Sequence, residues 1–203
     1  MSAVDAAVTA LAAGEPVVLP TDTVYGLCAT PYRDEPVRRI YHLKGRDDLQ
    51  PTALLAHDVD FLLECVPELR GRAATQARAL LPGPYTLVLP NPARRYPWLT
   101  GSRPETIGVR VPELEGPAAA VLARVGAVAA TSANTHGGRD PRRVDDVPAE
   151  VRAGCAVVVD GGELPGTPST VLDLTGDEPR VLRAGAVSAE AALERLGAAA
   201  VPL

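Results

Sequence analysis

The sequence predicts an α/β protein built on a mixed sheet with flanking helices. Short runs rich in Val, Leu and Thr alternate along the chain with segments of helical apolar spacing, and glycine or proline marks most of the junctions. The chain has 203 residues and is 46% hydrophobic, which is enough for a sizeable core. Aromatic residues make up only 3%, so Ala, Val and Leu must build that core.

The elements follow in order along the chain, helices first. Ser2 can cap a helix over residues 2–13 that Gly14 stops, and Val37, Ile40 and Tyr41 have helical spacing. The helices are predicted at residues 2–13, 34–43, 58–65, 70–80, 117–124 and 188–196.

The strands are short, and turn residues bound each of them. They are predicted at residues 16–20, 52–56, 85–89, 106–111, 126–131, 156–160, 169–174 and 180–183. Loops are predicted after the first strand, through residue 26, and over the polar stretch 134–148.

Composition excludes several classes of protein. The net charge of −5 disfavours broad electrostatic binding of RNA or DNA, although a local basic patch remains compatible with it. Cys28, Cys65 and Cys155 lack metal-ligand spacing and are expected to be buried thiols in a reducing compartment. No signal segment or membrane-spanning run is recognised, so a cytoplasmic location is expected.

One basic residue stands apart by its type. Lys44 is the only lysine among 20 lysines and arginines. A lysine in an arginine-rich sequence indicates a place where a compact ammonium is needed, or it is a coincidence of composition.

Familiar phosphate-binding loops are missing from the sequence, since neither G-x-x-x-x-G-K-[ST] nor G-x-G-x-x-G after a strand occurs. Polar residues gather instead at predicted strand ends and loops, where binding sites often lie. Each group alone is also compatible with a cap or a turn. The groups are residues 20–26 (PTDTVYG), 44–46 (KGR), 106–110 (TIGVR), 131–134 (TSAN), and 169–170 together with 183–185.

Arg110 is unusual because it lies in the β-rich run TIGVRVP, where alternation places it on one face of the sheet. A charge in such a place must either be ion-paired or bind an anion. Both interpretations remain open from the sequence.

Seven motifs occur in one order: PTDTVYGL (20–27), KGR (44–46), LPGPYTLVLP (81–90), TIGVRVP (106–112), TSAN (131–134), STVLDL (169–174) and LRAG (182–185). In order and spacing they resemble the YrdC/TsaC family of threonylcarbamoyl-AMP synthases. The resemblance covers about residues 14–186 and is to the short form, so one domain over residues 1–203 is expected.

The resemblance implies a YrdC-like twisted mixed sheet with a large concave cationic cavity. It implies that L-threonine, bicarbonate and ATP are joined to L-threonylcarbamoyl-AMP with release of pyrophosphate. Mg²⁺ is expected with ATP, and partner proteins are expected to pass the threonylcarbamoyl group to tRNA. The resemblance thus implies that tRNA is a partner only indirectly, through the transfer proteins, and that no membrane is involved.

Family positions carry over residue by residue. Arg110 matches the position that binds the threonine carboxylate, Thr23 and Ser169 match positions for the amine and hydroxyl, and main chain near Ala130 closes that pocket. Lys44, Arg46, Ser132 and Asn134 match the catalytic tetrad, with Lys44 expected to be an exposed cation facing the phosphates. Gln50, Thr106 and Arg183 match further ATP-binding positions.

The sequence departs from the family pattern in places. Asp47 and Asp48 follow KGR where proline is common, Ala184 replaces a proline, and Asp140 occupies a place where a small residue contacts the nucleotide. Two alternatives stay open: a relative that acts on another acceptor, and an RNA-binding module without chemistry. The low aromatic content and the net charge disfavour the second.

Overall fold

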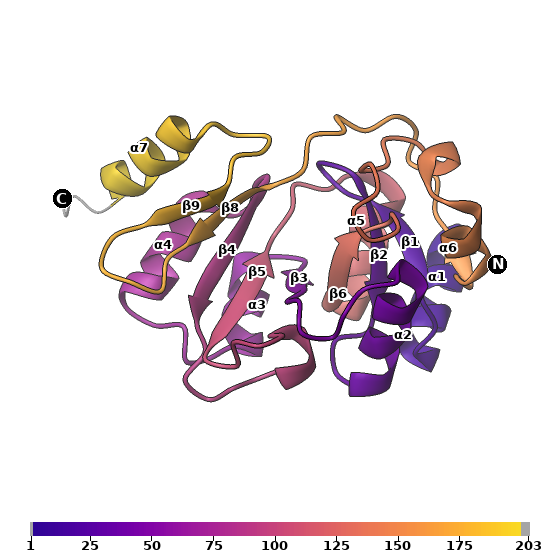
Figure 1. Ribbon diagram of the computed structural model, residues 1–203, viewed down its shortest axis with the longest axis horizontal. Helices are drawn as coiled ribbons and strands as arrows, with labels where there is room; N and C mark the ends of the chain where they lie inside the picture. Colours follow the sequence, from indigo (N-terminus) through magenta and orange to yellow (C-terminus); the bar gives the residue numbers. More distant parts are fainter. Residues whose placement is uncertain (1, 200–203) are drawn as a thin grey trace.

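The computed structural model describes residues 2–199 and contains one nine-stranded sheet in the order β7-β1-β2-β6-β3-β5-β4-β8-β9 (Figure 1). The predicted domain ends, residue 1 and residues 200–203, lie outside the described residues. The strands are β1 Val17–Pro20, β2 Tyr25–Ala29, β3 Ala53–Ala56, β4 Tyr85–Pro90, β5 Thr106–Arg110, β6 Ala127–Ser132, β7 Val157–Val158, β8 Thr170–Asp173 and β9 Arg180–Arg183.

Parallel and antiparallel pairs both occur, so the predicted mixed α/β sheet is confirmed. The pairs β7–β1, β3–β5 and β4–β8 are parallel, and the other neighbouring pairs are antiparallel. The helices are α1 Ala3–Ala13, α2 Asp34–Lys44, α3 Val59–Cys65, α4 Arg72–Leu80, α5 Gly116–Val125, α6 Ala149–Ala153 and α7 Ala189–Ala199. Short 3₁₀ turns cover Pro97–Leu99 and Val144–Asp146.

Three predictions about elements were wrong. Tyr25 and Gly26, predicted as loop, begin β2, whose residues are all buried and therefore show no alternation. Helix α6 was missed because it is only five residues long. The strand predicted over 156–160 pairs only at Val157 and Val158.

Helix α1 begins and ends as the sequence predicts. Ser2 Oγ accepts a hydrogen bond from Asp5 N at 3.1 Å, and the Asp5 carboxylate accepts from Ser2 in return, which makes a capping box. This helix packs against α5 at the end of the molecule opposite α7 (Figure 1).

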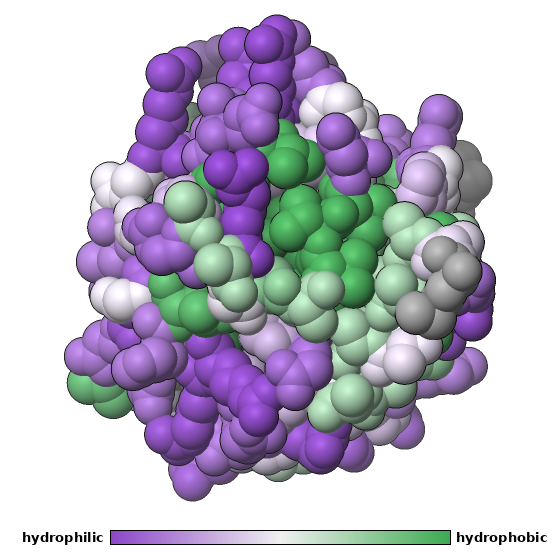
Figure 2. Space-filling model, turned by 90° about the vertical axis from the view of Figure 1, so that its right-hand side faces the viewer, coloured by the Kyte–Doolittle hydropathy of each residue, from purple (hydrophilic) through white to green (hydrophobic). Residues whose placement is uncertain are grey.

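Helices cover both faces of the sheet near β1. The strands in this part of the sheet are therefore continuous apolar runs in the sequence. Val17 and Leu19 pack with α1 and α5, whereas Val18, between them, packs into the larger core on the other face. Viewed from the end with α1 and α6, apolar residues form one continuous area (Figure 2).

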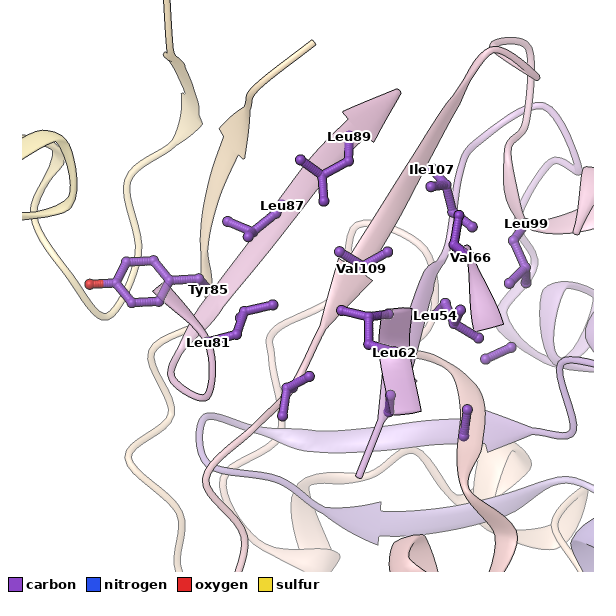
Figure 3. Close-up of a cluster of buried hydrophobic side chains, with 14 of the residues drawn as sticks. Leu54, Leu62, Val66, Leu81, Tyr85, Leu87, Leu89, Leu99, Ile107 and Val109 are labelled. Atoms are coloured by element: carbon purple, nitrogen blue, oxygen red, sulfur yellow. The ribbon is translucent and has the colours of Figure 1, made fainter. Parts of the chain in front are cut away.

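Strands β4 and β5 differ from β1 because only one of their faces is packed. Leu87 and Leu89 of β4 and Ile107 and Val109 of β5 point into the larger core, with Leu62 of α3 among their neighbours (Figure 3). The intervening residues face the opposite side, which is open. The alternation that the sequence predicted for Arg110 therefore places it on this open face.

Two further expectations concern location and thiols. None of the described helices is long and apolar enough to cross a membrane. All three cysteines are free, but only Cys28 is fully buried; Cys65 and Cys155 are partly exposed, so the expectation of three buried thiols was wrong for two of them.

The two faces of β4 predict different costs of truncation. Leu87→Ala should lower the free energy of unfolding by about 2–5 kcal/mol because it opens a hole in packed core. Val88→Ala, on the open face of the same strand, should cost only about 1 kcal/mol. Denaturant unfolding of both variants checks this, and equal losses would contradict the assignment of the faces.

Candidate functional site

A cavity of about 340 Å³ lies against the open face of β4 and β5 and extends to the ends of β2 and β6. Eight of the predicted site residues line it: Thr23, Arg46, Thr106, Arg110, Ala130, Ser132, Ser169 and Arg183. Lys44, Gln50 and Asn134 are not part of its wall. Segments far apart in the sequence thus meet around one space.

The turn between β1 and β2 forms one wall of the cavity. Thr21 Oγ1 donates to Val24 O at 2.7 Å and accepts from the backbone N–H groups of Thr23 and Val24, each at 3.2 Å. Such bonds from a threonine side chain to nearby backbone fix a turn. The turn therefore holds Thr23, which is fully buried, and Asp22 in set positions.

Arg110 reaches this turn from the end of β5. Its Nη2 donates to Asp22 Oδ1 at 2.6 Å and to Thr23 Oγ1 at 3.3 Å. The side chains of Arg110 and Asp22 are only 11% and 9% exposed. Burial lowers the pKa of Arg110, and the charge of Asp22 opposes this; burial likewise raises the pKa of Asp22 against the charge of Arg110. The internal ion pair that the sequence left open is thus present, and Arg110 also lines the cavity.

Ser169, just before β8, connects two walls. Its Oγ shares a hydrogen bond with Thr86 Oγ1 at 2.8 Å, and its carbonyl accepts from Arg183 Nη2 at 2.8 Å. Gly185 lets the chain approach closely here, because a Cβ at this position would lie 2.2 Å from Pro168 O. Ala184 stands where the family commonly has proline, but the hydrogen bonds to Ser169 still fix the position of Arg183.

Helix α2 delivers the KGR segment. The helix ends at Lys44 and is followed by the cap residue Gly45, whose φ of 63° favours glycine. The turn at Gly45 directs Arg46 toward the cavity. Arg46 Nε donates to Gln50 Oε1 at 3.0 Å, and Nη1 donates to Thr131 Oγ1 at 3.2 Å. Gln50 therefore holds Arg46 from behind the wall.

Lys44 is buried, and the expectation of an exposed cation was wrong. Its Nζ donates to Ser132 O at 2.7 Å, to Asn134 O at 3.0 Å and to Ser132 Oγ at 3.3 Å, and it also contacts Asn134 Oδ1. Only 5% of Lys44 is exposed. Burial, and next the charge of Arg46, lower its pKa to about 8, while the charge of Asp140 opposes both. The ammonium thus fills a socket of oxygens behind Ser132.

The acidic departures from the family pattern have different positions. Asp47 Oδ1 accepts from Leu49 N at 2.8 Å, and Asp48 pairs with Arg38 at 2.6 Å, so both are engaged outside the cavity wall. Asp140 lines the cavity, with its Oδ1 3.4 Å from Asn134 Nδ2.

Several site residues had no signal of their own in the sequence. Arg103 lines the cavity beside Thr106, whose Oγ1 donates to Arg103 O at 3.1 Å. Thr52 lies beside the Arg46 guanidinium together with Thr131 of the predicted TSAN group, and Thr86 supports Ser169. The alternation in β4 and β5 could have found Thr86, since it shares the open face with Gly108 and Arg110.

Known proteins resemble this chain over nearly its whole length. Residues 9–185 match the model of the Sua5/YciO/YrdC family, described as telomere recombination. A Mycobacterium tuberculosis relative is 36% identical over 201 residues, which cover 97% of this chain and 90% of that protein. The threonylcarbamoyl-AMP synthase of Bacillus subtilis is 36% identical over 87% of this chain and 51% of its own length.

Solved structures resemble it as well. Pyrococcus abyssi Sua5 in complex with L-threonine superposes with a TM-score of 0.85 and 32% identity, covering 96% of this chain and 57% of that one. Both the extent of the family match and the identity of the relatives show that this chain is a member of the Sua5/YciO/YrdC family.

Proposed function

We propose that this protein is an L-threonylcarbamoyladenylate synthase, a nucleotidyltransferase that uses L-threonine, bicarbonate and ATP. The observation that carries the proposal is that one cavity joins Arg110, Thr23 and Ser169 with Arg46 and the other predicted ATP-binding positions on its wall. Two substrates must react with each other, and a shared cavity supplies the proximity that this requires.

One end of the cavity suits an amino acid. Arg110 lines this end, and a bond between its guanidinium and a carboxylate would be charge-assisted and directional. Thr23 and Ser169 are small hydroxyl residues beside it, and the backbone of Ala130 lies on the same wall. The relative from Pyrococcus abyssi has been seen with L-threonine, which supports threonine as the amino acid here.

The remainder of the cavity suits a triphosphate. Arg46, Arg103 and Arg183 line it, and Ser132 contributes a hydroxyl. Lys44 adds positive charge directly behind Ser132. Asn134 Oδ1 accepts from Ser132 Oγ at 2.8 Å, so Asn134 orients that hydroxyl. Thr106 and Gln50 hold Arg103 and Arg46 in place.

The reaction we infer proceeds without a covalent enzyme intermediate. The threonine amine adds to CO₂ derived from bicarbonate and loses a proton, which gives a carbamate. A carbamate oxygen then attacks the α-phosphorus of ATP while the bond to the β-phosphate oxygen breaks, so that pyrophosphate leaves. The protein contributes positioning and fixed positive charge at the α-phosphate.

Magnesium is expected to enter with ATP. The described residues include no cluster of three His, Cys, Asp or Glu that could hold a metal ion by itself. Mg²⁺ commonly keeps several waters and binds mainly through substrate phosphates, which needs few protein ligands.

The product is proposed to feed the threonylcarbamoyladenosine modification of tRNA through transfer proteins. The protein itself should therefore release pyrophosphate from ATP when threonine and bicarbonate are present and tRNA is absent. Mass spectrometry of a reaction that contains a mixture of amino acids should detect threonylcarbamoyl-AMP. A strict need for tRNA would refute the proposed activation step. A carbamoyl-AMP product that contains another amino acid would assign a different substrate in place of threonine.

Arg110→Lys should weaken threonine binding about ten- to a hundred-fold, because one charge-assisted bond contributes roughly 1.5–3 kcal/mol. Affinity for a non-hydrolysable ATP analogue should stay within about twofold. Lysine keeps the ion pair with Asp22, whereas Arg110→Ala would leave a buried carboxylate unpaired and destabilise the fold. Calorimetric titrations measure both affinities, and equal weakening of both ligands would count against a carboxylate-binding role.

Lys44→Arg should lower turnover and also destabilise the protein, by about 1–3 kcal/mol, because the larger guanidinium must enter a socket that fits an ammonium. Arg38→Lys is the matched control: it is exposed on the same helix and should change stability by less than about 0.5 kcal/mol. Thermal unfolding and pyrophosphate release are the two measurements. A fully stable and active Lys44→Arg protein would show that only charge matters there.

A further inference from the structure

Arg110 differs in its partners from the other cations that line the cavity or lie directly behind its wall. Lys44, Arg46 and Arg183 donate to carbonyl, hydroxyl and amide oxygens, which are neutral, and none of the three is ion-paired in the described part of the chain. Arg103 has carboxylates only at 3.5 Å and 3.8 Å. Arg110 alone in this described set has a carboxylate oxygen in close contact, Asp22 Oδ1 at 2.6 Å.

The ion pair is not arranged for maximum stability. Arginine and carboxylate can form two parallel bonds, but here a single nitrogen, Nη2, makes the contact. Arg110 Nε is buried and has no hydrogen-bond partner among the described residues. Buried polar atoms without partners are costly, which indicates that the pair has a role besides holding the fold together.

Asp22 does not line the cavity, whereas Arg110 does. A ligand in the cavity can therefore contact the guanidinium directly, whereas the carboxylate of Asp22 acts on the ligand only through its negative charge. At such short range and away from bulk water, this charge cancels much of the attraction that Arg110 exerts on an anion.

We propose that Asp22 is a specificity-determining residue: it offsets the charge of Arg110 at the amino-acid end of the cavity, whereas the cationic end at Arg46 has no carboxylate partner among the described residues. The Arg110 end accepts a zwitterion, whose carboxylate bonds to the guanidinium while its ammonium is drawn toward Asp22. Phosphate groups are repelled by Asp22 in proportion to their charge and go to the other end. This inference rests on the proposed function, and it explains how the triphosphate avoids the amino-acid subsite.

Asp22→Asn separates charge from shape, because asparagine keeps an oxygen that can accept from Nη2. The probe is inorganic phosphate in competition with L-threonine, titrated by calorimetry while a saturating non-hydrolysable ATP analogue occupies the cationic end. In the variant, phosphate should compete with threonine at least about tenfold more strongly than in the wild-type protein. A merely structural role predicts no such gain, since a loosened Arg110 would bind both phosphate and threonine less well.

Asp140→Asn is the matched control, since it removes a carboxylate from the wall of the same cavity but leaves Arg110 paired. Competition between phosphate and threonine should then stay at the wild-type level. An Asp140→Asn effect equal to that of Asp22→Asn would overturn the inference, because total cavity charge would then set the selectivity.

The wild-type protein provides a test that does not depend on the folding of any variant. Phosphate should displace the ATP analogue at concentrations that leave threonine bound, and equal displacement of both would overturn the inference. If the wild-type protein binds threonine but phosphate competes equally well in Asp22→Asn and in the wild-type protein, the inference is overturned and the proposed function stands. Absence of threonine binding to the wild-type protein would overturn the proposed function as well.

Discussion

Alternation along β4 and β5 is the constraint on which the site depends. Leu87, Leu89, Ile107 and Val109 enter the core from one face, so the residues between them must face the cavity. A slip of one residue would bury Arg110 in the core and expose Ile107, which makes the register strongly specified. The packing energy of the core thus also fixes where the guanidinium of the proposed amino-acid subsite lies.

The cations are held by groups that belong to other segments. Arg46 donates to Thr131 at the end of β6, and Arg183 donates to Ser169 before β8. Lys44 joins the end of α2 to residues 132–134. These bonds hold the positive charges in place before any ligand arrives, which is the arrangement expected for electrostatic stabilisation of a phosphoryl-transfer reaction. Lys44 is therefore both a source of charge and a structural residue.

The motif PTDTVYG illustrates how one short segment serves several purposes. Thr21 closes the turn, Asp22 pairs with Arg110, and Thr23 forms part of the wall. The hydroxyl of Tyr25 donates to Gly162 O at 2.7 Å and accepts from Gly161 N at 3.0 Å, which ties the chain after β7 to β2. The two ends of the cavity differ because one of these residues, Asp22, is charged.

The sequence by itself determined the α/β class and most element positions, because strand alternation and caps are local properties. Eight residues of the cavity wall followed from the resemblance of its motifs to a known family. It could not determine that Tyr25 begins a strand, since a strand buried on both faces has no alternation to read. Nor could it place Lys44 behind Ser132 or pair Arg110 with Asp22. Those contacts join residues 88 positions apart in each case, and only the folded sheet brings them together. Exposure and ion pairing depend on which distant segments meet, and that was decided by the tertiary structure.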